Sequence, residues 1–177
     1  MSSAPDLKEK IDRIQLLVLD VDGVLTDGKV ILGNEEELKQ YDVKDGAGIK
    51  YLMRSGIRVA ILTGRQSRTV ERRSRELGVT ECLQGRRKKL PAYLELIDRL
   101  DLNEEAVACM GDDLPDLPLF NHCGLSLAPA DATPEVRERA DFVSSAPGGH
   151  GAVRDAVEVI LKTQGKWTDL LESYLVQ

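Results

Sequence analysis

The sequence predicts an α/β fold with a doubly wound parallel sheet. Short apolar runs alternate with stretches of helical periodicity along the 177 residues, and this alternation is typical of parallel strands covered by helices. Three apolar runs end in polar residues: 16–19 is followed by Asp20, 57–62 by Thr63, and 106–110 by Gly111 and Asp112. Because open α/β sheets bind ligands beyond the carboxyl ends of their strands, we expect one functional site there.

The elements follow in chain order from the apolar spacing and from the glycines and prolines that end helices. A lead-in helix at 5–13 precedes the strand 16–19, and a β-hairpin with strands at 29–32 and 37–41 follows it. Beyond the hairpin we expect helices at 46–55, 67–77, 91–100, near 117, at 134–140 and at 152–162, separated by strands at 57–62, 81–83, 106–110, 125–127 and 142–143. Residues 167–176 also have helical spacing, which predicts packing on the chain's own core, with an intersubunit contact as the alternative.

The composition fits one globular domain over 1–177, with a hairpin flap at 27–45 and a C-terminal tail at 165–177. Hydrophobic residues make up 42% of the chain, enough for a sizeable core. The net charge of -6 argues against nucleic-acid binding, although arginines and lysines gather between 65 and 89. Since no apolar run approaches the ~20 residues that span a bilayer, we expect no membrane segment and a cytoplasmic location. The three cysteines lack metal-ligand spacing and are expected to be unreactive core thiols.

Asp20 and Asp22 are separated by one residue at the end of the first strand. Residues two apart on a strand point to the same side, so these carboxylates would repel each other unless a cation or a proton intervenes. The pair therefore predicts a metal site. The alternative is that both aspartates only form a turn or cap a helix.

The segment Asp-Val-Asp-Gly-Val-Leu-Thr at 20–26 resembles the first motif of the haloacid dehalogenase-like superfamily. The resemblance implies a Rossmann-like fold and Mg²⁺ as cofactor. It also implies that Asp20 attacks phosphorus to form an aspartyl-phosphate, and that Asp22 protonates the leaving alcohol and then activates water. A carboxylate is a weak nucleophile towards an anionic ester, so bound Mg²⁺ is needed to neutralise charge.

Three further segments resemble the remaining motifs in order. Thr63-Gly64-Arg65 implies a phosphate contact, with a helix cap as the alternative for Thr63. Alignment of the segment 84–90 favours Lys89 over Lys88 as the motif lysine. Gly-Asp-Asp-Leu-Pro-Asp at 111–116 implies Asp112 as a Mg²⁺ ligand beside the Asp20 carboxylate and the Asp22 backbone carbonyl, whereas Asp113 and Asp116 are expected to orient the loop or Lys89.

From about 16 to 162 the sequence is similar to the bacterial 3-deoxy-D-manno-octulosonate 8-phosphate phosphatases, which are capless members of the superfamily. The segments that carry the similarity are 20–28, 45–49, 63–65, 111–116 and 148–154. The resemblance implies a homotetramer that hydrolyses a small phosphorylated sugar acid. It also implies substrate contacts, at Asp22, Asp42, Val43, Lys44, Asp45, Gly46, Lys50, Gly64, Arg65, Arg73, Lys89 and Asp116. Lys50, His150 and the tail from Trp167 depart from the family pattern.

Two other functions remain open on the sequence alone. A phosphatase for nonulosonate (sialic-acid-like) 9-phosphates would use every one of the same catalytic residues. A non-catalytic oligomerisation or regulatory module is the third reading, because a fold alone does not establish an activity. The chain lacks a Gly-x-x-x-x-Gly-Lys-Ser/Thr loop and a Gly-x-Ser-x-Gly turn, and its two histidines are too few for a zinc site, although His150 is a candidate for approaching the site.

Overall fold

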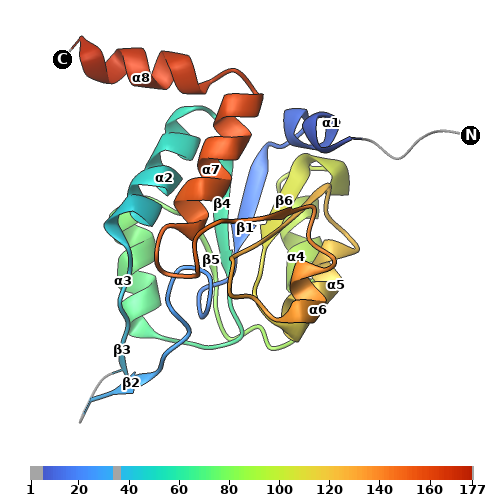
Figure 1. Ribbon diagram of the computed structural model, residues 1–177. Helices are drawn as coiled ribbons and strands as arrows, with labels where there is room; N and C mark the ends of the chain where they lie inside the picture. Colours follow the sequence, from blue (N-terminus) through green and yellow to red (C-terminus); the bar gives the residue numbers. More distant parts are fainter. Residues whose placement is uncertain (1–5, 34–36, 177) are drawn as a thin grey trace, which may run out of the picture.

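A six-stranded parallel sheet forms the centre of the molecule (Figure 1). The computed structural model describes residues 6–33 and 37–176. The strands are β1 (Leu16–Leu19), β4 (Arg58–Leu62), β5 (Glu81–Leu83), β6 (Val107–Met110), β7 (Leu125–Ala128) and β8 (Phe142–Val143). Their spatial order is β5-β4-β1-β6-β7-β8. The chain therefore adds β4 and β5 on one side of β1 and then β6, β7 and β8 on its other side. The doubly wound fold is therefore confirmed, and its switch point lies between β1 and β6, where such sheets bind ligands.

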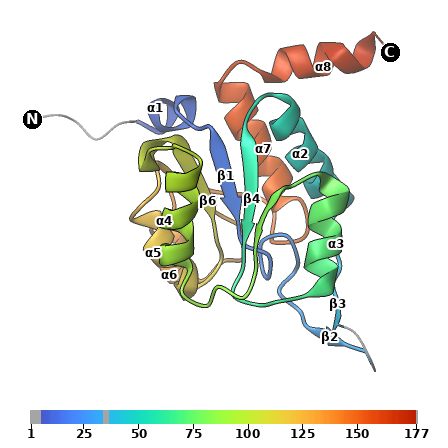
Figure 2. The ribbon, with the colours of Figure 1, turned by 180° about the vertical axis from the view of Figure 1, so that it is seen from behind.

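Helices cover both faces of the sheet (Figure 2). One face packs against α1 (Leu7–Asp12), α2 (Val43–Arg54), α3 (Arg68–Leu77) and α7 (Ala152–Thr163). The opposite face packs against α4 (Lys89–Arg99), α5 (Leu117–Phe120) and α6 (Pro134–Arg137). Short 3-10 turns at Glu104–Ala106 and Leu114–Asp116 flank β6.

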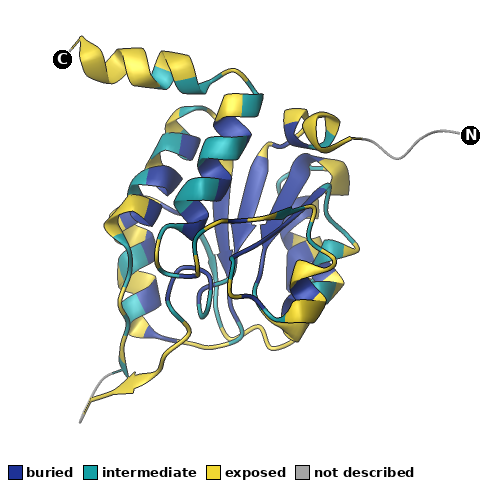
Figure 3. Cartoon of the chain, in the orientation of Figure 1, coloured by how far each residue is buried: buried dark blue, intermediate teal, exposed yellow. Residues whose placement is uncertain are grey.

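The central strand β1 is buried on both sides (Figure 3). Leu17 and Leu19 pack with the α2 and α7 side, whereas Leu16 and Val18 pack with the α4 side. A continuous apolar run is expected for a strand covered by helices on both faces, because neither face meets water. This burial fixes the point at which the chain leaves the sheet, immediately before Asp20.

Two predicted helix starts were wrong by a few residues. The helix α2 begins at Val43 rather than near 46, because Oδ1 of Asp42 accepts a hydrogen bond from the Lys44 N–H at 2.6 Å and caps the helix. The helix α4 begins at Lys89 rather than at Pro91, since a proline is tolerated in the first turn of a helix. The predicted end of α3 is confirmed, with Gly78 in the left-handed conformation at φ +82°.

The hairpin has two strands of two residues each, β2 (Ile31–Leu32) and β3 (Glu37–Leu38), and is shorter than predicted. Residues 34–36 of its predicted turn lie outside the described residues. The hairpin projects from the end of the sheet at which the carboxyl ends of the strands lie (Figure 1). The predicted flap is therefore in a position to border the site.

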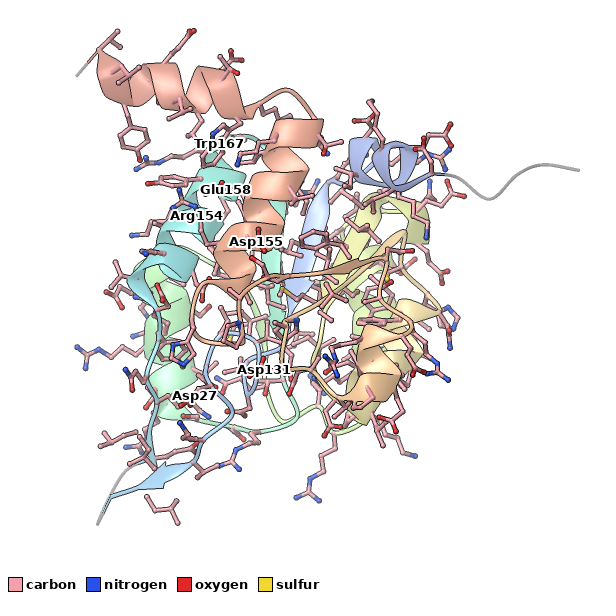
Figure 4. All side chains as sticks on the ribbon, viewed as in Figure 1. Asp27, Asp131, Arg154, Asp155, Glu158 and Trp167 are labelled. Carbon is pink, nitrogen blue, oxygen red and sulfur yellow. The ribbon has the colours of Figure 1, made fainter. Side chains whose placement is uncertain are left out.

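The tail forms α8 (Trp167–Leu175) and packs on its own chain. The guanidinium of Arg154 lies 4.9 Å from the centre of the Tyr51 ring and 5.5 Å from that of Trp167, so it is held between α2 and α8 (Figure 4). The helix lies at the opposite end of the sheet from the hairpin (Figure 1). Among the described residues, no helix is long and apolar enough to cross a membrane. Cys109 is buried, and Cys82 and Cys123 are half-buried free thiols.

Candidate active site

A cavity of about 540 Å³ lies at the carboxyl ends of β1, β4 and β6. It brings together most of the motif residues that the sequence singled out. Its lining consists of Asp20, Asp22, Gly28, Thr63, Gly64, Arg65, Arg87, Lys89, Asp112, Asp113, Pro115 and Asp116. The three polar strand ends therefore form one site, as predicted from the strand pattern.

Lys89 occupies the floor of this cavity between two carboxylates. Its Nζ lies 2.9 Å from Oδ1 of Asp20 and 2.6 Å from Oδ1 of Asp116, and only 4% of its side chain is exposed. Burial lowers the pKa of Lys89, but the charges of Asp20 and Asp116 outweigh it and leave the pKa raised. The residue therefore keeps its positive charge, whereas Lys88 is exposed to solvent.

Asp116 orients the loop that follows β6. Its Oδ2 accepts hydrogen bonds from the N–H groups of Asp112 at 3.1 Å and Asp113 at 3.4 Å. Gly111 allows this approach, because a Cβ at that position would overlap the Asp116 side chain. One carboxylate thus fixes both Lys89 and the backbone of Asp112.

The donor set of the site fits a magnesium ion. Carboxylate oxygens of Asp20, Asp112 and Asp116 lie within 4.8 Å of one another. Burial, followed by the charges of Asp20 and Asp116, raises the pKa of Asp112 to about 8, and burial likewise raises the pKa of Asp20. Carboxylates that crowd each other in this way favour a cation between them, and a cluster of hard oxygen donors suits Mg²⁺. Both oxygens of Asp116 are engaged, one by Lys89 and the other by the N–H groups of Asp112 and Asp113, so Asp20 and Asp112 are the side chains that could hold the ion.

The loop after β1 passes directly over Asp112. Gly23 has φ +91°, and a Cβ there would overlap the Asp112 carboxylate. The turn 148–151 packs on the same loop: the Gly149 N–H donates to the Val24 carbonyl at 3.0 Å, and a Cβ on Gly148 would overlap the Gly23 carbonyl. These glycines therefore shape the catalytic loop, while His150 is exposed and does not line the cavity.

The predicted phosphate-binding turn is held by the loop before α4. Thr63 is buried, and its Oγ1 accepts a hydrogen bond from the Arg65 N–H at 3.4 Å. The N–H groups of Gly85 and Arg86 donate to the carbonyls of Arg65 and Thr63, each at 3.0 Å. This pairing fixes both loops at the cavity wall.

Sequence reasoning missed two cations at the site. Arg87 lines the cavity, and Lys39 contacts the Asp22 carboxylate from the flap. Arg87 lies in the basic run 86–89, in which only the motif lysine gave a signal. For Lys39, the available signal was the pair Glu37 and Lys39, which lie two residues apart on the predicted strand 37–41 and would therefore point to the same side.

Several predicted sugar contacts lie outside the lining of this cavity: Asp42, Val43, Lys44, Asp45, Gly46, Lys50 and Arg73. Asp45 is buried, and its carboxylate accepts hydrogen bonds from the N–H groups of Arg154 at 2.8 Å and Gly151 at 3.2 Å. It therefore caps α7, a role that depends on a contact between distant parts of the chain. The guanidinium of Arg73 pairs with Glu76 at 3.2 Å and lies 5.5 Å from the centre of the Tyr41 ring.

Comparison with known proteins agrees with this geometry. Residues 81–154 match the model of the haloacid dehalogenase-like hydrolase family. The chain is 48% identical over 162 residues to the 3-deoxy-D-manno-octulosonate 8-phosphate phosphatase KdsC of Escherichia coli K12, covering 91% of this chain and 86% of that protein. It is 46% identical over 164 residues to KdsC of Salmonella typhimurium, covering 92% of this chain and 87% of that protein.

Solved structures are similar over almost the whole chain. The crystal structure of the 3-deoxy-D-manno-octulosonate 8-phosphate phosphatase of Yersinia pestis has a TM-score of 0.89 and 45% identity, covering 93% of this chain and 89% of that one. The Moraxella catarrhalis phosphatase, solved with magnesium, phosphate and KDO, has a TM-score of 0.92 and 38% identity, covering 94% and 97%. The chain therefore belongs to the 3-deoxy-D-manno-octulosonate 8-phosphate phosphatase family of the haloacid dehalogenase-like hydrolases.

Proposed function

We propose that this protein is a Mg²⁺-dependent phosphomonoesterase that hydrolyses 3-deoxy-D-manno-octulosonate 8-phosphate to the free sugar acid and phosphate. The observation that carries the proposal is the cavity in which Asp20, Lys89 and Asp112 meet at the strand ends. The 48% identity to a phosphatase named for this substrate supports the same reaction.

Asp20 is the proposed nucleophile. Its carboxylate oxygen forms a bond to phosphorus while the bond between phosphorus and the sugar oxygen breaks. Lys89, 2.9 Å from Oδ1, holds the carboxylate in one orientation and offsets part of the negative charge that meets the phosphate. Bound Mg²⁺, held by Asp20 and Asp112, would supply the remaining charge neutralisation.

Asp22 is the proposed general acid and base. It gives a proton to the sugar oxygen as that oxygen leaves, and it later takes a proton from the water that attacks the phosphorus of the aspartyl-phosphate. Attack of the water releases phosphate and restores the Asp20 carboxylate. Thr63 and the backbone of the turn 63–65 line the same cavity, where they are placed to bind phosphoryl oxygens.

We assign the recognition of the sugar-acid carboxylate to Arg87. Within the part of the chain that the structure describes, Lys89 and Arg65 pair with carboxylates of the protein, whereas no such ion pair involves Arg87. A guanidinium left available at a cavity wall suits a second anionic group on the substrate. Arg65, which the sequence predicts as a substrate contact, is proposed to contact the phosphate group of the substrate.

The proposal also includes a homotetramer in the cytoplasm. The cavity is open, and exposed apolar side chains gather on the flap, at Val30, Ile31, Leu32 and Leu38. A neighbouring subunit that covers such surfaces would also exclude water from the site. The predicted sugar contacts that lie outside the cavity, such as Lys50 and Arg73, would then act between subunits.

The test is phosphate release from four esters, with Mg²⁺ and with EDTA. The esters are 3-deoxy-D-manno-octulosonate 8-phosphate, N-acetylneuraminate 9-phosphate, glucose 6-phosphate and p-nitrophenyl phosphate. A Mg²⁺-dependent preference for the first supports the proposal. A preference for the second would instead identify a nonulosonate phosphatase, and no release from any ester would favour a non-catalytic module.

A further inference from the structure

The flap brings a lysine, Lys39, to the catalytic centre. Lys39 follows directly on β3, and its Nζ contacts Oδ1 of Asp22 and lies 2.8 Å from Oε1 of Glu37. Only 1% of the Lys39 side chain is exposed. Because a buried ammonium group is costly unless it is paired, these two carboxylates determine where the side chain lies.

Arg65 completes a ring of alternating charges. Its Nη2 lies 3.1 Å from Oε2 of Glu37, and its Nε lies 3.7 Å from Oδ2 of Asp22. Each oxygen of the Asp22 carboxylate therefore faces a different cation. The ring, which consists of Asp22, Lys39, Glu37 and Arg65, constrains both the position and the orientation of that carboxylate.

The strand β3, which supplies Glu37 and leads into Lys39, is attached to the body of the protein. The hydroxyl of Thr69, in the first turn of α3, donates a hydrogen bond to the Glu37 carbonyl at 3.1 Å. In Figure 1, β3 accordingly lies next to the N-terminal end of α3. The position of Asp22 is thus linked to the docking of the flap against α3.

The same arrangement occurs at the other catalytic carboxylate. Asp20 is held by Lys89, and Asp22 is held by Lys39, and both lysine side chains are almost completely buried. Lys89 belongs to α4 on one face of the sheet, whereas Lys39 comes from the strand docked against α3 on the other face. Two separate lysines therefore hold the two neighbouring carboxyl groups, one from each face of the sheet.

We propose that Lys39 is a positioning residue for Asp22. Lys39 contacts the Asp22 carboxyl group from the flap. This contact places that carboxyl group for proton exchange with the leaving oxygen and then with water. Proton transfer occurs efficiently only when the flap is docked. The inference rests on the proposed function and adds to it a residue that acts through Asp22 without lining the cavity.

The expected effect of removing Lys39 follows from the role of Asp22. General acid–base catalysis contributes about 10² to 10⁴-fold, and a misplacement of about 1 Å costs about 10²-fold. Lys39→Met should therefore lower kcat on a sugar phosphate about 100-fold and change KM less than about 3-fold. The p-nitrophenolate ion leaves without needing a proton, so transfer of phosphate from p-nitrophenyl phosphate to the enzyme should be largely retained.

The experiment compares steady-state hydrolysis of the sugar phosphate with the burst of p-nitrophenolate in rapid-mixing kinetics. Lys39→Arg, which keeps the charge, should recover most of the lost kcat. Lys29→Met is the matched control, because Lys29 lies on the same flap but is exposed and, among the residues that the structure describes, pairs with Asp27 and not with Asp22. Lys39→Met combined with Glu37→Gln keeps the ring's net charge unchanged and must show the same loss of kcat if Lys39 itself is responsible.

Two results would overturn the inference. One is a wild-type kcat on the sugar phosphate in Lys39→Met, both alone and combined with Glu37→Gln. The other is an equal loss of the sugar-phosphate rate and of the p-nitrophenolate burst, because Lys39 would then support the site as a whole. A wild-type enzyme that releases no phosphate contradicts the proposed function instead, so the two failures are distinguishable.

Discussion

The ammonium group of Lys89 lies 2.6 Å from Oδ1 of Asp116, and both side chains are almost completely buried. This ion pair is joined to Asp112, a proposed metal ligand, since the other oxygen of Asp116 accepts the N–H of Asp112. Removing one partner of a buried pair leaves the other charge without compensation. The pair therefore links the stability of the fold to the geometry of the catalytic loop.

Asp116→Asn should destabilise the metal-free protein by about 3 kcal/mol, because Lys89 then keeps only Asp20 as a counter-charge. Urea unfolding followed by circular dichroism measures the change in the free energy of unfolding. Asp98→Asn, an exposed site in α4, is the control and should change it by less than about 0.5 kcal/mol. Equal stability of the two variants would contradict the role given to the pair.

Asp112→Asn should weaken Mg²⁺ binding at least about 10-fold, since one of the two carboxylates assigned to the ion is lost. Isothermal titration calorimetry with Mg²⁺ and no substrate measures this directly. The Asp98→Asn control should bind Mg²⁺ as the wild type does. Unchanged affinity in Asp112→Asn would remove Asp112 from the metal site.

Gly23→Ala should abolish Mg²⁺-dependent turnover, because the new Cβ overlaps the Asp112 carboxylate. Gly56→Ala is the matched control: its φ of +83° causes similar backbone strain, but beyond its chain neighbours no heavy atom of the described residues lies within 4 Å of the added Cβ. Both variants should lose about 1 to 2 kcal/mol of stability from the left-handed backbone. Only Gly23→Ala should lose activity, and comparable activities would show that the close approach does not matter.

Arg87→Gln should raise KM for the sugar-acid phosphate about 10-fold, because a charge-assisted hydrogen bond to the carboxylate is lost. The kinetics on p-nitrophenyl phosphate, which has no carboxylate, should stay close to those of the wild type. Arg86→Gln changes the neighbouring arginine, whose side chain does not line the cavity, and should affect neither substrate. A parallel loss on both substrates would mean that Arg87 binds the phosphate.

The fold and the motif residues could be predicted because they depend on local pattern. The apolar run of β1 ends where Asp20 begins, and parallel strands bring Asp20, Thr63 and Asp112 to one edge of the sheet. Lys89 could be separated from Lys88 because the segment 84–90 resembles the family motif, and the structure buries Lys89 at the start of α4 and exposes Lys88.

The remaining contacts depend on how distant segments dock, which no local pattern encodes. Lys39 reaches Asp22 only because β3 is anchored to α3 through Thr69. The resemblance to the family predicts a substrate contact at Asp45. In the structure, Asp45 caps α7 by accepting a hydrogen bond from the N–H of Arg154, 109 positions further along the chain. The position of Arg87 at the cavity wall depends on the hydrogen bonds that join its loop to the turn at Thr63.

We propose that Asp20 carries the phosphoryl group during turnover of a sugar-acid phosphate. The most direct measurement is mass spectrometry of enzyme quenched in acid during turnover of 3-deoxy-D-manno-octulosonate 8-phosphate with Mg²⁺. One phosphoryl adduct is expected on the peptide that contains Asp20, and neither adduct nor turnover is expected for Asp20→Asn. An adduct on another residue, or rapid turnover by Asp20→Asn, would contradict this role of Asp20.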